Sequence, residues 1–334
     1  MTLTAFLNSS YDGLPMRMPT WLCMTQVVLI GLQLAPGGKP KNEGSIGAGE
    51  GPAWHPSGGL YFTGQNHIGR RDTSGNVQVF RESAGGANGL LFDRQLRLLV
   101  CESRNRRITR TEANGDVTVL ADIYEGHRFN SPNDLTIDSK GRIYFSDPRY
   151  GRRDDMEMRD AEGRLMEGVY RIDAPGKVTR VIGREVERAN GVLVSPDDKF
   201  LYVADNNNNT VGGARKLWRF DLNSGGSIDP ASRRLIFDWR DGRGPDGVKQ
   251  DGKARLYVAA GLNKAHPPFE SSAEFKGGVY ILSPEGKLLG FVPVPVDVVS
   301  NCAFGDTDLR TLFITAGGTL WSIRVDTPGF VAWK

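Results

Sequence analysis

Hydrophobic residues recur along the chain in a two-part pattern, in which two short apolar runs are separated by a polar turn. In residues 189–204, Val192-Leu193-Val194 is followed by Ser195-Pro196-Asp197-Asp198 and then by the apolar run 200–204. β-Branched and aromatic residues favour strands, while Pro and Asp favour the turn between them. The pattern therefore predicts an antiparallel hairpin.

The same hairpin unit occurs six times along the chain, at intervals of roughly 40 to 55 residues, the length typical of one four-stranded propeller blade. Each unit opens on a polar residue just before its first apolar run. These openers are Glu50, Asn88, Asn133, Asn190, Asp246 and Asn301. We therefore predict an all-β protein, a six-bladed β-propeller, with almost no helix after residue 40.

The sixth unit contains only three clear apolar runs, at 301–304, 312–315 and 319–325. A blade that lacked its fourth strand would leave an open sheet edge in the ring. We expect the segment before Glu50 to supply that strand. Residues 41–334 would then form a single propeller domain, preceded by a leader at 1–40.

The leader has no repeat character. It combines Arg17 with the apolar stretch 27–34, which is typical of a secretory signal peptide, but it lacks a clean cleavage site of small residues. A disordered leader is the alternative interpretation. The first interpretation predicts a periplasmic or secreted protein, and the second a cytoplasmic one. The apolar stretch is too short for a stable membrane span.

Composition and motifs exclude several function classes. The net charge is only +3 and the basic residues are scattered, so no nucleic-acid partner is expected. The three cysteines show neither zinc-site nor disulfide-framework spacing. The Gly-x-Ser-x-Gly elbow of serine hydrolases is absent, as are the P-loop and the dinucleotide-binding motif. The oligomeric state stays open.

The six openers share a chemistry as well as a position. In a propeller the first strand of each blade lines the central axis, so equivalent positions form a ring. All six openers carry a side-chain oxygen, and Glu50 and Asp246 are carboxylates. Such a ring suits one hard divalent cation, calcium first, with Zn²⁺, Mg²⁺ and Mn²⁺ as alternatives. The competing interpretation is that these residues only form the turns of a propeller.

Chain direction separates the two faces of the predicted propeller. The second strand of each unit returns toward the openers, so the loops that follow second strands should surround the ring. His67, Arg106 and His266 lie in or beside these loops, and we expect them to contact a small polar substrate. Turns such as 138–139 and 197–198 should lie on the opposite face.

Five motifs in order resemble the gluconolactonase, senescence marker protein (regucalcin) and luciferin-regenerating enzyme family. They are Glu50-Gly51-Pro52-Ala53-Trp54, Ser131-Pro132-Asn133-Asp134-Leu135, Ala189-Asn190-Gly191, Ser195-Pro196-Asp197 and Gly244-Pro245-Asp246-Gly247. The resemblance covers roughly residues 45–326. It implies a calcium-dependent propeller with the metal ligands Glu50, Asn133, Asn190 and Asp246, of which Asn133 alternatively binds substrate. It does not explain the charged insertion at 149–167.

The resemblance also implies a calcium-dependent hydrolase of carboxylic esters, a gluconolactonase-like enzyme acting on a sugar lactone. Calcium polarises a carbonyl but acidifies water less than zinc does, so a protein base is needed. Asp246 is the best candidate for that base, with metal ligation alone as its alternative role. Two other functions stay open: phosphotriester hydrolysis at the same site, as in diisopropylfluorophosphatase, and ligand binding without catalysis.

Overall fold

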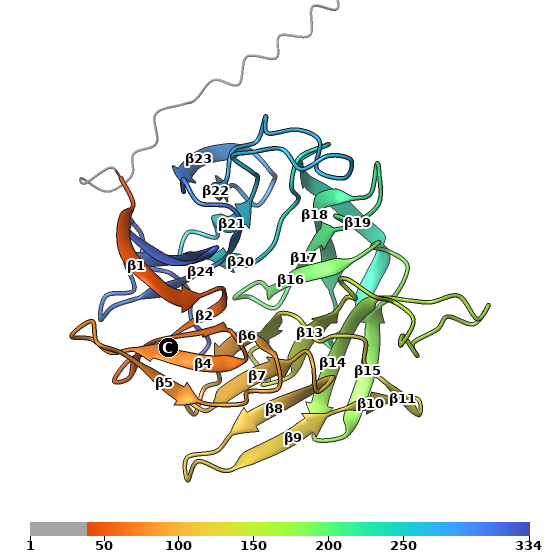
Figure 1. The fold of residues 1–334 in the computed structure, drawn as a ribbon. Helices are drawn as coiled ribbons and strands as arrows, with labels where there is room; N and C mark the ends of the chain where they lie inside the picture. The colour runs from red at the N-terminus through yellow and green to blue at the C-terminus, as the bar shows by residue number, and fades with distance from the viewer. Residues whose placement is uncertain (1–38) are drawn as a thin grey trace, which may run out of the picture.

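A computed structural model describes residues 39–334, and within this range it contains 26 strands and no helix. Six four-stranded antiparallel sheets surround one axis as the blades of a propeller (Figure 1). The prediction of an all-β, six-bladed propeller is confirmed. The expected signal peptide lies almost wholly outside the described residues. Inside them no helix is long and apolar enough to cross a membrane.

The first three blades each use four strands in chain order, from the axis outward. Blade 1 consists of β2 (Glu50–His55), β3 (Gly59–Gly64), β4 (His67–Arg71) and β5 (Val77–Arg81). Blade 2 consists of β6 (Ala87–Phe92), β7 (Leu98–Glu102), β8 (Arg107–Thr111) and β9 (Val117–Ala121). Blade 3 consists of β12 (Leu135–Ile137), β13 (Ile143–Asp147), β14 (Gly168–Ala174) and β15 (Lys177–Ile182). A short hairpin of β10 (Ile123–Tyr124) and β11 (His127–Arg128) joins blades 2 and 3.

Blades 4 and 5 repeat this order. Blade 4 consists of β16 (Ala189–Val194), β17 (Phe200–Asn206), β18 (Arg215–Leu222) and β19 (Ile228–Asp238). Blade 5 consists of β20 (Val248–Gln250), β21 (Leu256–Ala260), β22 (Gly278–Leu282) and β23 (Leu288–Pro293). Apolar side chains of neighbouring blades pack together, so the core lies between the blades rather than inside a single sheet.

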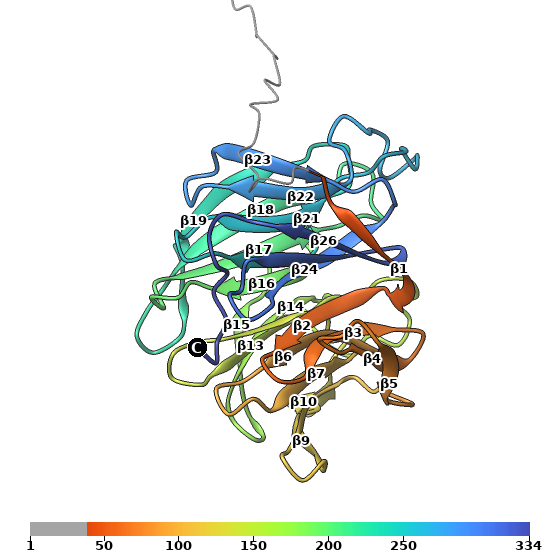
Figure 2. The ribbon, with the colours of Figure 1, turned by 90° about the vertical axis from the view of Figure 1, so that its left-hand side faces the viewer.

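Blade 6 closes the ring with strands from both ends of the described chain. Its inner strands are β24 (Val299–Gly305), β25 (Thr311–Ala316) and β26 (Gly318–Arg324), and its outermost strand is β1 (Lys41–Ala48). Figure 2 shows β1 beside β26. Glu43 on β1 strengthens the closure, because it accepts a 2.7 Å hydrogen bond from Ser322 and pairs with Arg71 at 3.0 Å. The prediction that residues before Glu50 supply the fourth strand is confirmed.

The inner strands approach one another most closely just after the openers. Gly89 and Gly191 donate their backbone N–H groups to the carbonyl oxygens of the next blade's openers, at 2.7 and 3.2 Å. A Cβ atom on Gly51, Gly89 or Gly191 would lie 2.0, 2.6 or 2.1 Å from such an oxygen. The glycine that follows each of these three openers is therefore required by packing between the blades. Packing does not explain why the opener itself carries a polar side chain.

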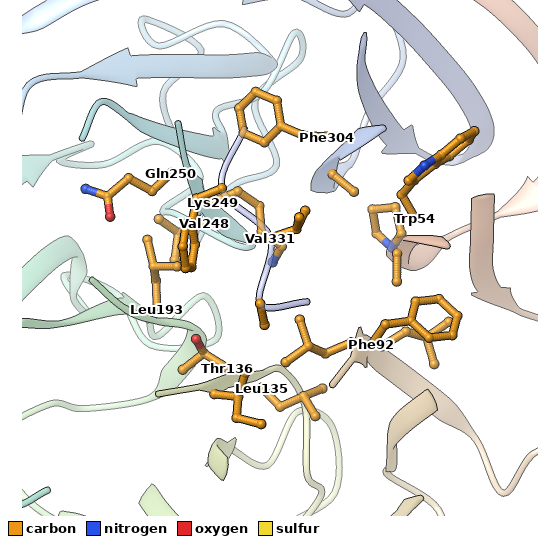
Figure 3. Close-up of a pocket in the computed structure, with 18 of the residues that line it drawn as sticks. Trp54, Phe92, Leu135, Thr136, Leu193, Val248, Lys249, Gln250, Phe304 and Val331 are labelled. Atoms are coloured by element: carbon orange, nitrogen blue, oxygen red, sulfur yellow. The ribbon is translucent and has the colours of Figure 1, made fainter. Parts of the chain in front are cut away.

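The C-terminal residues fill the opposite end of the axis. Figure 3 shows Val331 surrounded by side chains from inner strands, among them Trp54, Phe92, Leu193 and Phe304. Only a largely apolar cavity of about 70 Å³ is left there. Residues 330–333 thus occupy this end of the axis, and the openers mark the other end.

We expect Gly191→Ala to destabilise the protein by roughly 1–3 kcal/mol, the usual cost of overpacking. The new Cβ would lie 2.1 Å from the carbonyl oxygen of Asp246, a backbone atom that cannot move aside freely. Gly252→Ala is the matched control, because the nearest atom to its new Cβ would be the Pro328 carbonyl oxygen, 3.5 Å away. Urea denaturation should show a lower midpoint for the first variant only, and equal midpoints would contradict the packing argument.

Candidate functional site

A polar cavity of about 360 Å³ opens at the mouth of the axis, where the inner strands begin. It is lined by Glu50, Asn88, Asn133, Tyr150, Gly151, Asn190, Asn208, Asn209, Arg243 and Asp246. All four residues predicted as metal ligands are in this set, and they come from four different blades. The structure therefore brings them together, while their role as ligands stays a prediction.

Glu50 lies against the neighbouring opener of blade 6. Its Oε2 accepts hydrogen bonds from the Gly51 N–H at 2.9 Å and from Asn301 Nδ2 at 3.1 Å. Burial raises the pKa of Glu50 well above its ordinary value, and the negative charge of Asp246 raises it further. The two carboxylates of the ring therefore destabilise each other when both are ionised.

Asp246 is held by an arginine three residues earlier in the chain. Arg243 Nη2 lies 3.0 Å from Asp246 Oδ2, and Arg243 Nη1 lies 3.0 Å from Glu270 Oε1. Burial raises the pKa of Asp246 to about 6, although the charge of Arg243 opposes the shift. Arg243 was not among the residues predicted for the site. Its only sequence signal is its place beside the Pro245-Asp246-Gly247 motif.

Asn190 leaves a buried oxygen without a partner. Its Nδ2 donates to the Tyr150 hydroxyl at 2.9 Å, whereas its Oδ1 is buried and accepts no hydrogen bond. An unsatisfied buried acceptor costs about 1–3 kcal/mol, and a cation in the cavity would relieve that cost. The combination of two carboxylates with amide oxygens thus fits a hard cation. In residues 39–334 no three or more His, Cys, Asp or Glu side chains gather as a metal site.

Three residues predicted at the mouth do not line the cavity. Arg106 is buried, donates to the carbonyls of Phe129 and Arg128, and pairs with Glu157 at 3.1 Å. Its guanidinium is therefore engaged in holding loops together, and contact of Arg106 with a substrate stays a prediction.

The two histidines of that prediction lie elsewhere around the rim. His67 begins β4, and the backbone N–H of His266 donates to the Glu270 carbonyl at 2.7 Å. The His266 side chain is 54% exposed. Since neither histidine lines the cavity, contact of either one with a substrate stays a prediction.

The turns expected on the far face are indeed separate from the cavity. Asp138, Ser139 and Asp198 line a smaller hollow together with Phe330 and Lys334 of the C-terminal segment. Ser139 also donates its backbone N–H to Asp198 at 3.0 Å, so these polar residues bind each other. The strand directions inferred from the hairpin pattern are therefore correct.

Comparison with known proteins identifies the family. The family model for the SMP-30/Gluconolactonase/LRE-like region matches residues 48–318. The chain belongs to this family. The matched region contains all six openers, but it takes in only the last residue of β1 and only the first of β26. In this member of the family, the pairing that closes the ring thus lies almost wholly outside the matched region.

Several characterised proteins are similar along most of the chain. A gluconolactonase of Zymomonas mobilis is 30% identical over 305 residues, which cover 84% of this chain and 79% of the relative. A pentonolactonase of Haloferax volcanii is 27% identical over 277 residues, covering 81% of each chain. The solved structure of a gluconolactonase of Xanthomonas campestris is 30% identical, with a TM-score of 0.68, and the likeness covers 84% of this chain and 88% of that one.

Glu50→Gln is expected to stabilise the chelator-treated protein at pH 8. The folded-state pKa of Glu50 is raised, so its ionisation opposes folding at high pH. The gain should shrink toward pH 4, where glutamic acid is protonated in both the folded and the unfolded protein.

Thermal unfolding across this pH range measures the effect. Glu285→Gln is the control, since it removes the same charge from an exposed residue far from the cavity. A Glu50→Gln variant that is less stable than the parent at pH 8 would contradict the predicted repulsion.

Proposed function

We propose that the protein is a divalent-cation-dependent lactonase that opens a sugar lactone, with calcium as the first candidate for the cation. The observation that carries the proposal is the meeting of five oxygen-bearing openers in one polar cavity, among them the four predicted cation ligands. The similarity to a gluconolactonase and a pentonolactonase supports the reaction class. The product of such a reaction is a hydroxy acid.

The cavity favours a small hydrophilic substrate. Its volume of about 360 Å³ falls within the usual size of small-molecule sites. Apart from Gly151, every lining residue has a polar group on its side chain, and Asn88, Asn208 and Asn209 contribute amides. Amides both donate and accept hydrogen bonds, which suits the hydroxyl groups of a sugar ring. A polyhydroxylated lactone therefore fits this surface better than an apolar ester.

Glu50, Asn133, Asn190 and Asp246 would hold the cation. When bound, it would supply a positive charge that polarises the lactone carbonyl. The two carboxylates whose repulsion is described above would then be neutralised, and the orphaned Asn190 oxygen would gain a partner. An all-oxygen donor set favours calcium, and Mg²⁺, Mn²⁺ and Zn²⁺ stay as alternatives.

Asp246 is the proposed general base. With a pKa of about 6 before any cation binds, it is mostly ionised at neutral pH and can accept a proton from water. The water oxygen bonds to the carbonyl carbon, the bond from that carbon to the ring oxygen breaks, and the ring oxygen leaves with a proton. Arg243 holds one carboxylate oxygen of Asp246 and so limits its movement. Ligation of the cation without proton transfer is the alternative role of Asp246.

A panel of sugar lactones assayed before and after chelation tests the proposal. We expect hydrolysis of at least one lactone, loss of activity in EDTA, and recovery on adding calcium. Hydrolysis of a phosphotriester without any lactone would favour the first alternative function. Cation binding without hydrolysis of either class would indicate a propeller that only binds a ligand.

The variants Asp246→Asn and Glu50→Gln separate catalysis from ligation. Each removes one negative charge and keeps an oxygen in the ring. If Asp246 is the base, its variant should remain about 100-fold or more slower at saturating calcium, the usual range for loss of a general base. Glu50→Gln should recover better, because weaker cation binding is its main defect. Equal recovery of both variants, measured as kcat against calcium concentration, would exclude Asp246 as the base.

A further inference from the structure

We propose that Tyr150 is a positioning residue, which orients the Asn190 amide so that its oxygen is left for the cation. The proposal rests on the cation-dependent function above and assigns a role to the inserted segment 149–167. This segment connects β13 to β14 and carries Tyr150 to the cavity wall. Neither the repeat pattern nor the openers account for it.

The hydrogen bonds of the Tyr150 hydroxyl determine the orientation of the Asn190 amide. The single hydroxyl hydrogen of Tyr150 is donated to the Asn206 carbonyl at 3.2 Å. Toward Asn190 the hydroxyl can therefore only accept, so it selects Nδ2, which lies 2.9 Å away. This contact uses the nitrogen, and Oδ1 is left as the unpartnered atom.

The insertion is built to hold the tyrosine ring in place. The guanidinium of Arg188 lies over the Tyr150 ring, with its Cζ atom 5.4 Å from the ring centroid. Arg188 is 4% exposed and pairs with Glu167, the last residue of the insertion, at 2.9 Å. Glu167 also pairs with Arg153 at 3.0 Å and accepts the backbone N–H of Arg149. Glu167 thus joins the two ends of the insertion, and the ring cannot swing away without breaking these contacts.

The other inserted residues give the segment its own packing. Met156, Met158 and Met166 are each buried, with at most 5% exposure, and Met158 belongs to the apolar cluster between blades 2 and 3. Such a segment forms a fixed wall. A fixed hydroxyl next to a ligand amide corresponds to the partners that orient metal-binding side chains, whose loss typically weakens metal binding by about 10–100-fold.

The principal test is Tyr150→Phe, which removes the hydroxyl and keeps the ring under Arg188. We expect calcium affinity, measured by isothermal titration calorimetry, to fall about 10-fold or more. Activity lost at low calcium should return as calcium is raised. Tyr280→Phe is the matched control, because its hydroxyl also donates one bond to a backbone carbonyl, that of Lys276 at 2.7 Å, outside the cavity. Its calcium affinity should equal that of the parent.

Repeating Tyr150→Phe in an Asn190→Asp protein tests whether Tyr150 acts by orienting the amide or only by stabilising the fold. In Asn190→Asp the side chain presents oxygen on both sides, so there is no amide left to orient. Tyr150→Phe should then change calcium affinity less than threefold, and the difference between the two backgrounds gives the coupling. An unchanged affinity in Tyr150→Phe alone, or an equal loss in both backgrounds, would overturn the proposal. A changed KM with unchanged calcium affinity would show that Tyr150 contacts the substrate instead.

Side-chain amide exchange keeps this test independent of the proposed function. In ion-free protein, the Nδ2 hydrogens of Asn190 should exchange with solvent about 5-fold faster in Tyr150→Phe than in the parent, since one hydrogen bond of about 1 kcal/mol is lost. Absence of cation binding by the parent would refute the proposed function. The exchange rates would still decide the role of Tyr150, because equal rates in the two proteins would contradict it.

Discussion

The contact on which the site depends is the close approach of inner strands to the opener backbone of the next blade, seen in blades 1, 2 and 4. At Gly51, Gly89 and Gly191 this approach leaves no room for a Cβ atom. The resulting hydrogen bonds fix the distance between blades at the mouth of the axis. Five of the six opener side chains are thereby held around one small cavity, although each belongs to a different blade. The geometry of the site is a property of the ring, since no single blade could create it.

The charges and polar groups at the mouth of the axis destabilise the arrangement that this packing imposes. Two buried carboxylates face each other, one buried amide oxygen lacks a partner, and Arg243 is already shared between Asp246 and Glu270. The carboxylate repulsion and the unpartnered oxygen both lower the stability of the ring, and both would be relieved by one positive charge at the centre, whereas Arg243 already offsets part of the charge of Asp246. Functional sites commonly carry such a local cost, which the surrounding structure must offset. Here the offset comes from the apolar layers between the blades.

Residues whose position follows from the repeat were predictable from the sequence. Residues whose contacts depend on where a long side chain reaches were not. The openers and the use of β1 in blade 6 follow from strand periodicity and the need to close a sheet edge. Chain direction locates a backbone but not the end of a flexible guanidinium group, and that of Arg106 donates to carbonyls of another loop and does not line the cavity. Tyr150 was missed since its contacts join loops far apart in the chain, and Arg243 since its place beside a motif does not show that its guanidinium reaches Asp246 and Glu270.

The closure of blade 6 has a consequence for folding. Glu43 on β1 bonds to Ser322, 279 positions later, so the outermost strand of the last blade is synthesised before the other three strands of that blade. Strands so far apart in sequence pair slowly, because closing the long loop between them costs conformational entropy before any contact forms. During synthesis β1 must wait, with its sheet edge unpaired, until β26 has been made. The strand that completes the ring is therefore also the one most exposed to wrong pairing in a growing chain.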